Sequence, residues 1–385
     1  MFKYLGLFYI HLLSVFTFRE FLDFRIVLDL NKRIYNHTPG PCRVLTEKCP
    51  SEIFIFSQSN SISDKGTAGL TYVDSQKRVY ITLGYGKSHN LTTNTGISFY
   101  NTNRSDGRSQ QEMYDLVEMS INWNGYEYQN LFIPTGIDSY SSSNGRVLLY
   151  VINAHPDHQC IHFFQVDNTK LNYRKSICDS SFTSLQDLSV VGPDRIFFTN
   201  MAAFGRGWAQ VVEFALQTGQ GVVYYYDGSK LAIGAPSVNA PTGIGYDSKR
   251  RILYVGSLIR ESLFAYKVAK DMTLELMYEM MLLTSPIGIF VESKTGDVWV
   301  AAHPVLHESA WHYTHPEKKN VHSSSQILRI RIQEEGSSWV TTEPYANDGA
   351  TISASSAIVY TDDQMIIGSS FGRLLHCDLT HSHIT

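Results

Sequence analysis

A hairpin-sized unit recurs six times in this chain, and this repetition constrains the fold more than any other feature. Each copy has a small residue, an apolar run, a turn of Asp, Ser, Gly or Lys type, and a second apolar run that ends in small residues. This is the pattern of two antiparallel strands joined by a short turn. The copies are AGLTYVDSQKRVYITLG from Ala68, PTGIDSYSSSNGRVLLYVINAHPD from Pro134, QDLSVVGPDRIFFTN from Gln186, PTGIGYDSKRRILYVGSL from Pro241, IGIFVESKTGDVWVAAHP from Ile287 and SAIVYTDDQMIIGSS from Ser356.

The spacing of the units indicates how they assemble. Equivalent residues of successive units lie 45 to 69 residues apart, which is longer and less regular than the period of a solenoid and suits four-stranded propeller blades with insertions. Further β-type runs lie between the units, at 222–228, 262–270 and 325–332. We therefore expect an all-β fold, a six-bladed β-propeller over residues 31–385, with a short N-terminal membrane-anchor helix and few accessory helices.

Composition and charge agree with this expectation and exclude some functions. Hydrophobic residues make up 43% of the chain and charged residues 18%, which is typical of a globular protein. Tyr and Phe, with 23 and 20 copies, favour pleated, half-buried surfaces. The net charge of -4 gives no electrostatic reason to expect a nucleic-acid partner. No nucleophile elbow, phosphate-binding loop, dinucleotide fingerprint or zinc-finger spacing is present.

The first 30 residues read as a targeting segment. An apolar run from Tyr4 to Phe18 follows Lys3 and has the length of a secretory h-region, but Arg19 and Glu20 follow it where a small-residue cleavage site would stand. We expect an uncleaved signal anchor that leaves the propeller on the lumenal or extracellular side. The alternatives are a removed signal peptide and a cytosolic amphipathic helix.

Three Asn-x-Ser/Thr sequons accompany this segment, at Asn36, Asn90 and Asn103. Their polar surroundings suit surface loops. Together with the targeting segment they predict a glycoprotein of the endoplasmic reticulum membrane, the plasma membrane or both.

Five cysteines are too few to build a disulfide scaffold and are not spaced as metal-binding pairs. In an oxidising compartment, a bond between Cys42 and Cys377 would tie the two ends of the propeller together and close the ring. A hairpin turning at residues 167–170 would place Cys160 opposite Cys178, where they either form a disulfide or remain buried thiols. Cys49 is left over.

Residues 207–219 carry the clearest helical pattern in the chain. Apolar residues recur on one side of this segment and a glycine ends it. We expect the apolar side to pack on the propeller, the alternative being contact with a membrane. The residues of this side are Trp208, Val211, Val212, Ala215 and Leu216.

Several segments together resemble the paraoxonase family, including a nematode branch. They are CRVLTEKCPSEIFIF, the second to fifth hairpin units, SSQILRI and the ending GRLLHCDL. The resemblance runs from Cys42 to Leu379. It implies a six-bladed propeller with two calcium ions in the central tunnel, a disulfide between the first and last blades, and calcium-dependent lactonase and arylesterase activity.

The calcium ligands that the resemblance implies are mostly replaced here. Glu52 matches the family's glutamate and Asp187 an aspartate, while Gln186 stands for an asparagine that offers the same amide oxygen. These three residues are the calcium candidates, and the alternative is that their side chains bond to backbone amides. Non-matching residues occupy the other ligand positions, namely Ile53, Thr242, Ile287 and Gly288.

The proton-transfer pair of the family, two histidines, is also incomplete. Thr135 occupies the first position and His155 matches the second. A threonine does not titrate near neutral pH and cannot act as the general base. Met201 and Ala202 stand where the family carries an Asp-His pair. We therefore interpret Thr135 and His155 as vestigial, and His155 as a hydrogen-bonded structural histidine.

Histidines also cluster between residues 303 and 322, which suggests a transition-metal site. Acidic or cysteine partners are not fixed nearby, so an exposed interaction loop is the preferred interpretation. The histidines are His303, His307, His312, His315 and His322. We place His376, His381 and His383 in a solvated C-terminal tail.

Loss of the hydrolase site leaves binding as the expected role. The nematode branch that the chain resembles includes accessory subunits and chaperones of degenerin-type sodium channels, which implies a membrane-protein client or channel subunit as partner. One competing hypothesis is a divergent calcium-dependent lactonase or arylesterase that uses Glu52, Gln186, Asp187 and His155. Another is an apolar small molecule bound in the tunnel without turnover.

Overall fold

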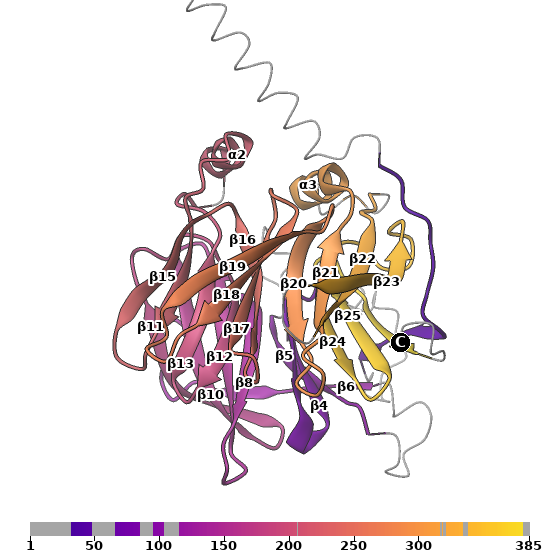
Figure 1. Ribbon diagram of the computed structural model, residues 1–385. Helices are drawn as coiled ribbons and strands as arrows, with labels where there is room; N and C mark the ends of the chain where they lie inside the picture. Colours follow the sequence, from indigo (N-terminus) through magenta and orange to yellow (C-terminus); the bar gives the residue numbers. More distant parts are fainter. Residues whose placement is uncertain are drawn as a thin grey trace, which may run out of the picture.

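Six sheets surround a central axis in the computed structural model, so the expected six-bladed β-propeller is confirmed (Figure 1). Each sheet is one blade, and its first strand lies at the axis beside the first strands of the two neighbouring blades. The structure describes residues 32–47, 66–84, 95–103, 115–205, 207–315, 318, 321–333 and 338–379. The expected anchor over residues 1–30 lies outside these ranges, as do Cys49, Glu52, Ile53, Asn90, His381 and His383.

The strands of each blade follow one another from the axis outward. In blades 1 to 3 they are β3 (Leu70–Val73), β4 (Arg78–Leu83), β5 (Gly96–Asn101) and β6 (Asp115–Glu118), then β8 (Pro134–Ser141), β9 (Val147–His155), β10 (His158–Asp167) and β11 (Lys170–Cys178), then β12 (Leu185–Gly192), β13 (Arg195–Asn200), β14 (Gly221–Tyr226) and β15 (Leu231–Val238). In blades 4 and 5 they are β16 (Pro241–Asp247), β17 (Ile252–Ser257), β18 (Ser262–Val268) and β19 (Leu274–Met281), then β20 (Ser285–Val291), β21 (Val298–His303), β22 (Ser325–Ile332) and β23 (Trp339–Asn347).

The sixth blade combines both ends of the chain. Its strands are β24 (Ser355–Thr361), β25 (Gln364–Ser369), β26 (Leu374–Asp378) and, outermost, β1 (Cys42–Val44). Cys42 lies directly opposite Cys377 in the β1–β26 pair, and the two form a disulfide. The expected ring closure is thus present. Short outer strands also join blade 1, through β2 (Thr46–Glu47), and blade 2, through β7 (Ser120–Asn122), each in parallel pairing.

All six repeat units form the two innermost strands of a blade. The glycine shared by the two Pro-Thr-Gly-Ile copies has a packing reason, because adjacent inner strands approach closely at this point. A Cβ on Gly136 would lie 2.7 Å from the backbone of Asp187, and one on Gly243 would lie 2.6 Å from the carbonyl oxygen of Ile287. Only glycine fits where the backbone of the next blade takes the place of a side chain.

Apolar cores lie between the blades. The six largest clusters of buried side chains each join the facing sheets of two neighbouring blades, including blades 1 and 6. Trp299, the largest fully buried side chain, belongs to the cluster between blades 5 and 6. Because every blade buries both faces, its strands are apolar on both sides, as the sequence of the repeat units indicates.

The outer hairpin of blade 2 has the expected geometry. Strands β10 and β11 turn at Asp167–Lys170, and Cys160 lies directly opposite Cys178. Of the two alternatives for this pair, the disulfide is the one present.

Two helices lie at one end of the propeller, α2 (Trp208–Ala215) between β13 and β14 and α3 (Leu306–Thr314) between β21 and β22 (Figure 1). A one-turn 3-10 helix, η2 (Asp74–Gln76), joins β3 to β4. None of the helices in the described ranges is long and apolar enough to cross a bilayer.

The expected packing of α2 on the propeller is wrong. Trp208, Val211 and Leu216 are 80%, 61% and 55% exposed. The helix instead buries Glu213, whose carboxylate accepts hydrogen bonds from the backbone amides of Ala203 and Phe204 at 3.1 and 3.3 Å. A carboxylate can be buried here because these amides satisfy it, and this contact turns the apolar side of α2 outward.

Candidate functional site

A cavity of about 1000 Å³ runs along the propeller axis. The inner strand of every blade lines it, and residues of α2 and α3 surround its end on the helical face, among them Trp208 and Tyr313. Most inner-strand side chains in this wall are aliphatic, such as Ile137, Leu188 and Ile244. The cavity therefore presents an apolar wall with a few polar groups set into it.

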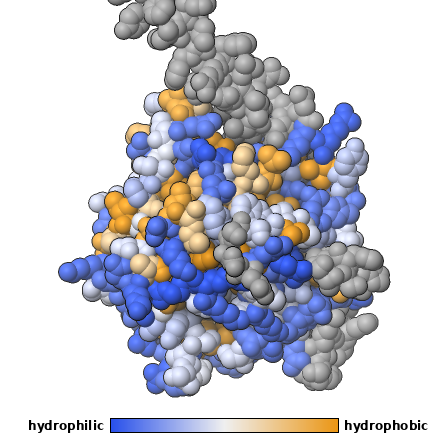
Figure 2. Space-filling view, in the orientation of Figure 1, coloured by the Kyte–Doolittle hydropathy of each residue, from blue (hydrophilic) through white to orange (hydrophobic). Residues whose placement is uncertain are grey.

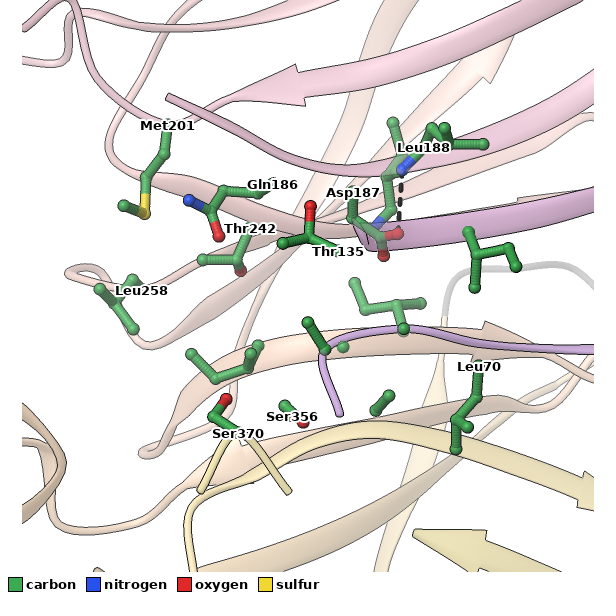
Figure 3. A pocket seen from close by; sticks show the side chains of 18 of the residues that line it. Leu70, Thr135, Gln186, Asp187, Leu188, Met201, Thr242, Leu258, Ser356 and Ser370 are labelled. Atoms are coloured by element: carbon green, nitrogen blue, oxygen red, sulfur yellow. Dashed lines mark hydrogen bonds between the residues drawn. The ribbon is translucent and has the colours of Figure 1, made fainter. Parts of the chain in front are cut away.

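The structure brings most of the sequence-predicted tunnel residues together. Thr135, Gln186, Asp187 and Thr242 line the cavity, and the close-up shows them near one another (Figure 3). Ile287 and Gly288 line it as well, at the positions where the family resemblance implies two oxygen ligands.

The side chain of Asp187 is bonded to backbone amides. One carboxylate oxygen accepts from Leu188 N at 2.9 Å, the bond drawn in Figure 3. The other accepts from Ile244 N, in the next blade, at 3.3 Å. Burial raises the pKa of this carboxyl group well above its usual range, with the amide bonds opposing the rise. This is the second of the two arrangements considered for Asp187 from the sequence.

Sequence reasoning missed a second carboxyl group in the tunnel wall, the half-buried Asp138 on β8. One of its oxygens accepts from Ser139 N at 2.7 Å and Thr71 Oγ1 at 3.1 Å, and the other from Val190 N at 2.7 Å. Burial raises its pKa to about 6. Asp138 thereby connects the inner strands of blades 1, 2 and 3. An acidic residue within the apolar Pro134 unit was the available signal.

Threonines also connect neighbouring blades. Thr82 donates to the carbonyl oxygen of Thr135 at 2.8 Å, Thr199 to that of Thr242 at 2.6 Å, and Thr242 to that of Pro286 at 2.7 Å. The Thr135 hydroxyl itself is buried without a hydrogen-bond partner among the described residues. Most polar groups at the inner strands thus hold blades together.

The two histidines nearest the tunnel have different surroundings. His155, at the end of β9, is buried, does not line the cavity, and accepts a hydrogen bond from Asp157 N at 3.2 Å. His303, at the end of β21, lines the cavity, is fully buried, and its Nε2 has no partner within the described residues. Burial lowers the pKa of His303 to about 4, so its imidazole is neutral at physiological pH.

The expected exposed histidine loop is wrong in part. Leu306–Thr314 of that segment form helix α3, and His303 and His312 are buried. His312 bonds Ser323 Oγ at 2.8 Å and stacks on Phe371 with ring centroids 3.5 Å apart. The five histidines do not form a metal-ligand cluster within the described ranges. His376 is also not in a solvated tail, because it lies buried in β26 and bonds the hydroxyl of Tyr100 at 2.8 Å.

Comparison with known proteins places the chain in a family. Residues 64–379 match the sequence profile described as Arylesterase. The chain belongs to the arylesterase family. Among the arylesterase relatives, Mechanosensory abnormality protein 6 of Caenorhabditis elegans is 78% identical over 361 residues, which covers 94% of this chain and 92% of the relative. Human serum paraoxonase/arylesterase 1 is 26% identical over 294 residues, covering 74% and 80%.

A solved structure outside the arylesterase relatives shows the same fold. A gluconolactonase of Xanthomonas campestris matches with a TM-score of 0.51 at 12% identity, covering 90% of this chain and 99% of that one. At this identity the likeness extends to the propeller alone.

The described tunnel residues do not fit the calcium ion that arylesterase membership implies. Such an ion takes about six to eight oxygen ligands, several of them carboxylates. The described carboxyl groups that line this part of the tunnel are Asp138 and Asp187, and all four of their oxygens already accept hydrogen bonds from protein groups. Two carboxyl groups engaged in this way fall short of the ligand set that the ion requires.

Proposed function

We propose that this chain is a catalytically degenerate arylesterase-family propeller that acts as a chaperone or accessory subunit for a membrane protein, such as a degenerin-type sodium channel. The observation that carries the proposal is the use of the carboxyl groups in the tunnel wall. Asp187 joins blade 3 to blade 4, and Asp138 joins blade 2 to blades 1 and 3. Groups committed to holding blades together are not available to hold a calcium ion, which is the group that would polarise an ester.

Two further observations support a binding role. Mechanosensory abnormality protein 6, at 78% identity, has a name that refers to touch sensation and not to hydrolysis. The helical face also exposes apolar side chains, with Trp208 and Val211 on α2 and Trp311, 53% exposed, on α3. Figure 2 shows apolar surface at the helical end of the molecule and also on the side of the propeller. The exposed apolar groups of α2 lie together on one helix, as is typical of a surface that another molecule covers.

The test of the accessory role uses the full chain and a degenerin-type channel subunit in one cell. We expect co-expression to raise the surface level of the channel, measured by surface biotinylation, and Val211→Ser with Trp208→Ser to abolish the increase. The matched control is Val340→Ser, because Val340 is an exposed valine, 47% accessible, on the outer strand β23. An unchanged surface level with the unsubstituted protein would contradict the proposal.

We propose that the protein is anchored by residues 1–30 in the endoplasmic reticulum or plasma membrane, with a glycosylated propeller on the lumenal or extracellular side. Two disulfides support an oxidising compartment. Asn36 is exposed, and its Oδ1 accepts from Asp348 N at 2.7 Å, which leaves Nδ2 for a glycan. Glycosidase treatment should increase gel mobility, and replacing Asn36, Asn90 and Asn103 by Gln should remove that change.

A second candidate function is a divergent calcium-dependent lactonase or arylesterase. The cavity of about 1000 Å³ and the arylesterase relatives favour it. Purified protein is assayed for lactone and aryl ester hydrolysis with calcium and with a chelator. Turnover that needs calcium and is lost in Glu52→Ala would establish this function and overturn the degenerate one.

A further inference from the structure

The disulfide between Cys160 and Cys178 is unequally accessible at its two sulfurs. Cys160 lies in β10 with no exposed surface, whereas Cys178, the last residue of β11, is exposed. A thiol in solution can therefore reach the bond at Cys178. Attack at that sulfur makes Cys160 the leaving thiolate.

His158 stands beside this bond. It precedes Cys160 by two residues on β10, so both side chains lie on the same face of the strand. Its Nε2 is 3.4 Å from the sulfur of Cys160. The ligand atoms of His158, Cys160 and Cys178 all lie within 4.8 Å of one another. An imidazole and two cysteine sulfurs are a ligand set that Zn²⁺ prefers.

Aromatic residues hold the imidazole in this position. Tyr128 stacks on His158 with ring centroids 4.3 Å apart, and the Tyr126 hydroxyl lies 2.7 Å from Nε2. Tyr126 in turn packs on Tyr173 of β11, with centroids 4.7 Å apart.

The distances suit a tetrahedral zinc ion once the sulfurs separate. Zinc bonds of about 2.3 Å to sulfur and about 2.0 Å to nitrogen place neighbouring ligands roughly 3.5 to 3.8 Å apart. The separation of Cys160 Sγ and His158 Nε2, 3.4 Å, is already close to the lower end of this range. The remaining change is the opening of the sulfur–sulfur bond, and the exposed Cys178 side chain can make that movement.

We propose that reduction of this disulfide creates a zinc site formed by Cys160, Cys178 and His158, with water as the fourth ligand. A small dithiol supplies the two electrons and two protons. A thiolate of the reductant attacks the sulfur of Cys178, and Cys160 departs as a thiolate. The second thiol of the reductant then displaces Cys178 from the mixed disulfide. The products are two protein thiols and the oxidised reductant. Zinc then displaces the two thiol protons to solvent, and the Tyr126 hydroxyl releases Nε2.

The disulfide between Cys42 and Cys377 differs from this one in its accessibility and in its surroundings. Cys377 is fully buried, Cys42 is half-buried, and this pair is not part of a metal-ligand cluster within the described residues. Mild reductant should therefore open the bond at Cys178 first. Because nothing in this argument depends on a client protein or on hydrolysis, the site stands independently of the proposed function.

The experiment uses the glycosylated full chain carrying Cys49→Ser, with Co²⁺ as a spectroscopic probe. After mild reduction, alkylation and mass spectrometry should find Cys160 and Cys178 free and the other pair intact. The reduced protein should bind one Co²⁺ and show thiolate charge-transfer and tetrahedral d–d absorption bands. The oxidised protein should show neither.

Substitutions identify the ligands. His158→Ala should weaken Co²⁺ binding by at least roughly tenfold, since even loss of a residue that only supports a ligand costs that much, and Cys178→Ser should remove one thiolate band. Tyr126→Phe should tighten binding, because no hydrogen bond at Nε2 must then be broken. The control is His315→Ala, a half-exposed histidine on the far side of the helical face.

Three outcomes would overturn the proposal. They are absence of the cobalt bands after reduction, equal affinity in His158→Ala, and loss of the native circular dichroism spectrum on opening the Cys160–Cys178 bond.

Discussion

Asp187 in the third blade accepts a hydrogen bond from the backbone amide of Ile244 in the fourth, at 3.3 Å. The same carboxyl group accepts from Leu188 N. Asp187, a position at which a calcium ligand is expected, therefore joins two blades through hydrogen bonds. The consequences for stability can be measured separately from any activity.

Replacing Asp187 should destabilise the propeller whether or not calcium is present. Asp187→Ala leaves two buried amides without acceptors, which should lower the free energy of unfolding by about 2 to 4 kcal/mol. Urea unfolding with calcium and with a chelator measures this. We expect equal midpoints in the two conditions for the unsubstituted protein. A calcium-dependent shift that disappears in Asp187→Ala would show that the carboxylate binds the ion.

Asp138 should make stability fall as pH rises. Its pKa is about 6 in the folded protein and 3.8 in the reference state, so the folded chain holds the extra proton between these values. This contribution is fully present below about pH 4 and is lost by about pH 6 to 7, and it amounts to about 3 kcal/mol at most. Urea unfolding from pH 4 to 7 measures it, and the difference between the unsubstituted protein and Asp138→Asn isolates this group. A pH-independent difference would contradict the assignment.

His312 should anchor helix α3. His312→Ala removes the stacking on Phe371 and the hydrogen bond to Ser323, which should cost about 1 to 3 kcal/mol. Hydrogen exchange across Leu306–Thr314 measures the local opening. His315→Ala is the matched control, because His315 stacks on Trp311 at the half-exposed end of the helix. Equal exchange in both variants would refute the anchoring role.

Acid should loosen α3 through the same residue. Burial lowers the pKa of His312 from 6.5 to about 4, so the unfolded state binds the proton first. The stability that the neutral imidazole contributes is complete above about pH 6.5 and is lost as pH falls toward 4. Exchange of α3 should therefore accelerate between pH 7 and pH 5, and this acceleration should be absent in His312→Ala.

Opening the ring should cost more than opening the outer hairpin. The Cys42–Cys377 bond spans 335 residues and the Cys160–Cys178 bond spans 18. Chain-entropy arguments give about 6 kcal/mol for the first and about 3 kcal/mol for the second. Calorimetry of the two double Cys→Ser variants compares them, and equal losses would show that loop length is not the controlling factor.

The repeat units predicted the six blades because a strand pair and its turn are encoded within about 15 to 20 neighbouring residues. The pairing of Cys160 with Cys178 was visible for the same reason, since both belong to one hairpin. Thr135 and Thr242 were located in the tunnel because they occupy equivalent positions in equivalent units.

The wrong expectations concern contacts that a helix or strand makes with residues outside itself. The apolar side of α2 faces outward because Glu213 finds amides at residues 203–204, and no helical periodicity reports such a contact. His303 and His312 are buried because β21 and α3 pack against the tunnel and Phe371. The sequence showed a run of histidines, and the fold separated them.

By itself, then, the sequence determined the number of blades and the inner strands, because these depend on a local pattern repeated six times. Only the tertiary structure decided what the polar groups do. The carboxyl groups of Asp138 and Asp187 accept hydrogen bonds from backbone amides 52 and 57 residues away. The imidazole of His158 lies next to the sulfurs of Cys160 and Cys178 and is held by two tyrosines. Such partnerships arise from the packing of neighbouring blades and outer segments, which brings donors and acceptors together without leaving a periodic signature in the chain.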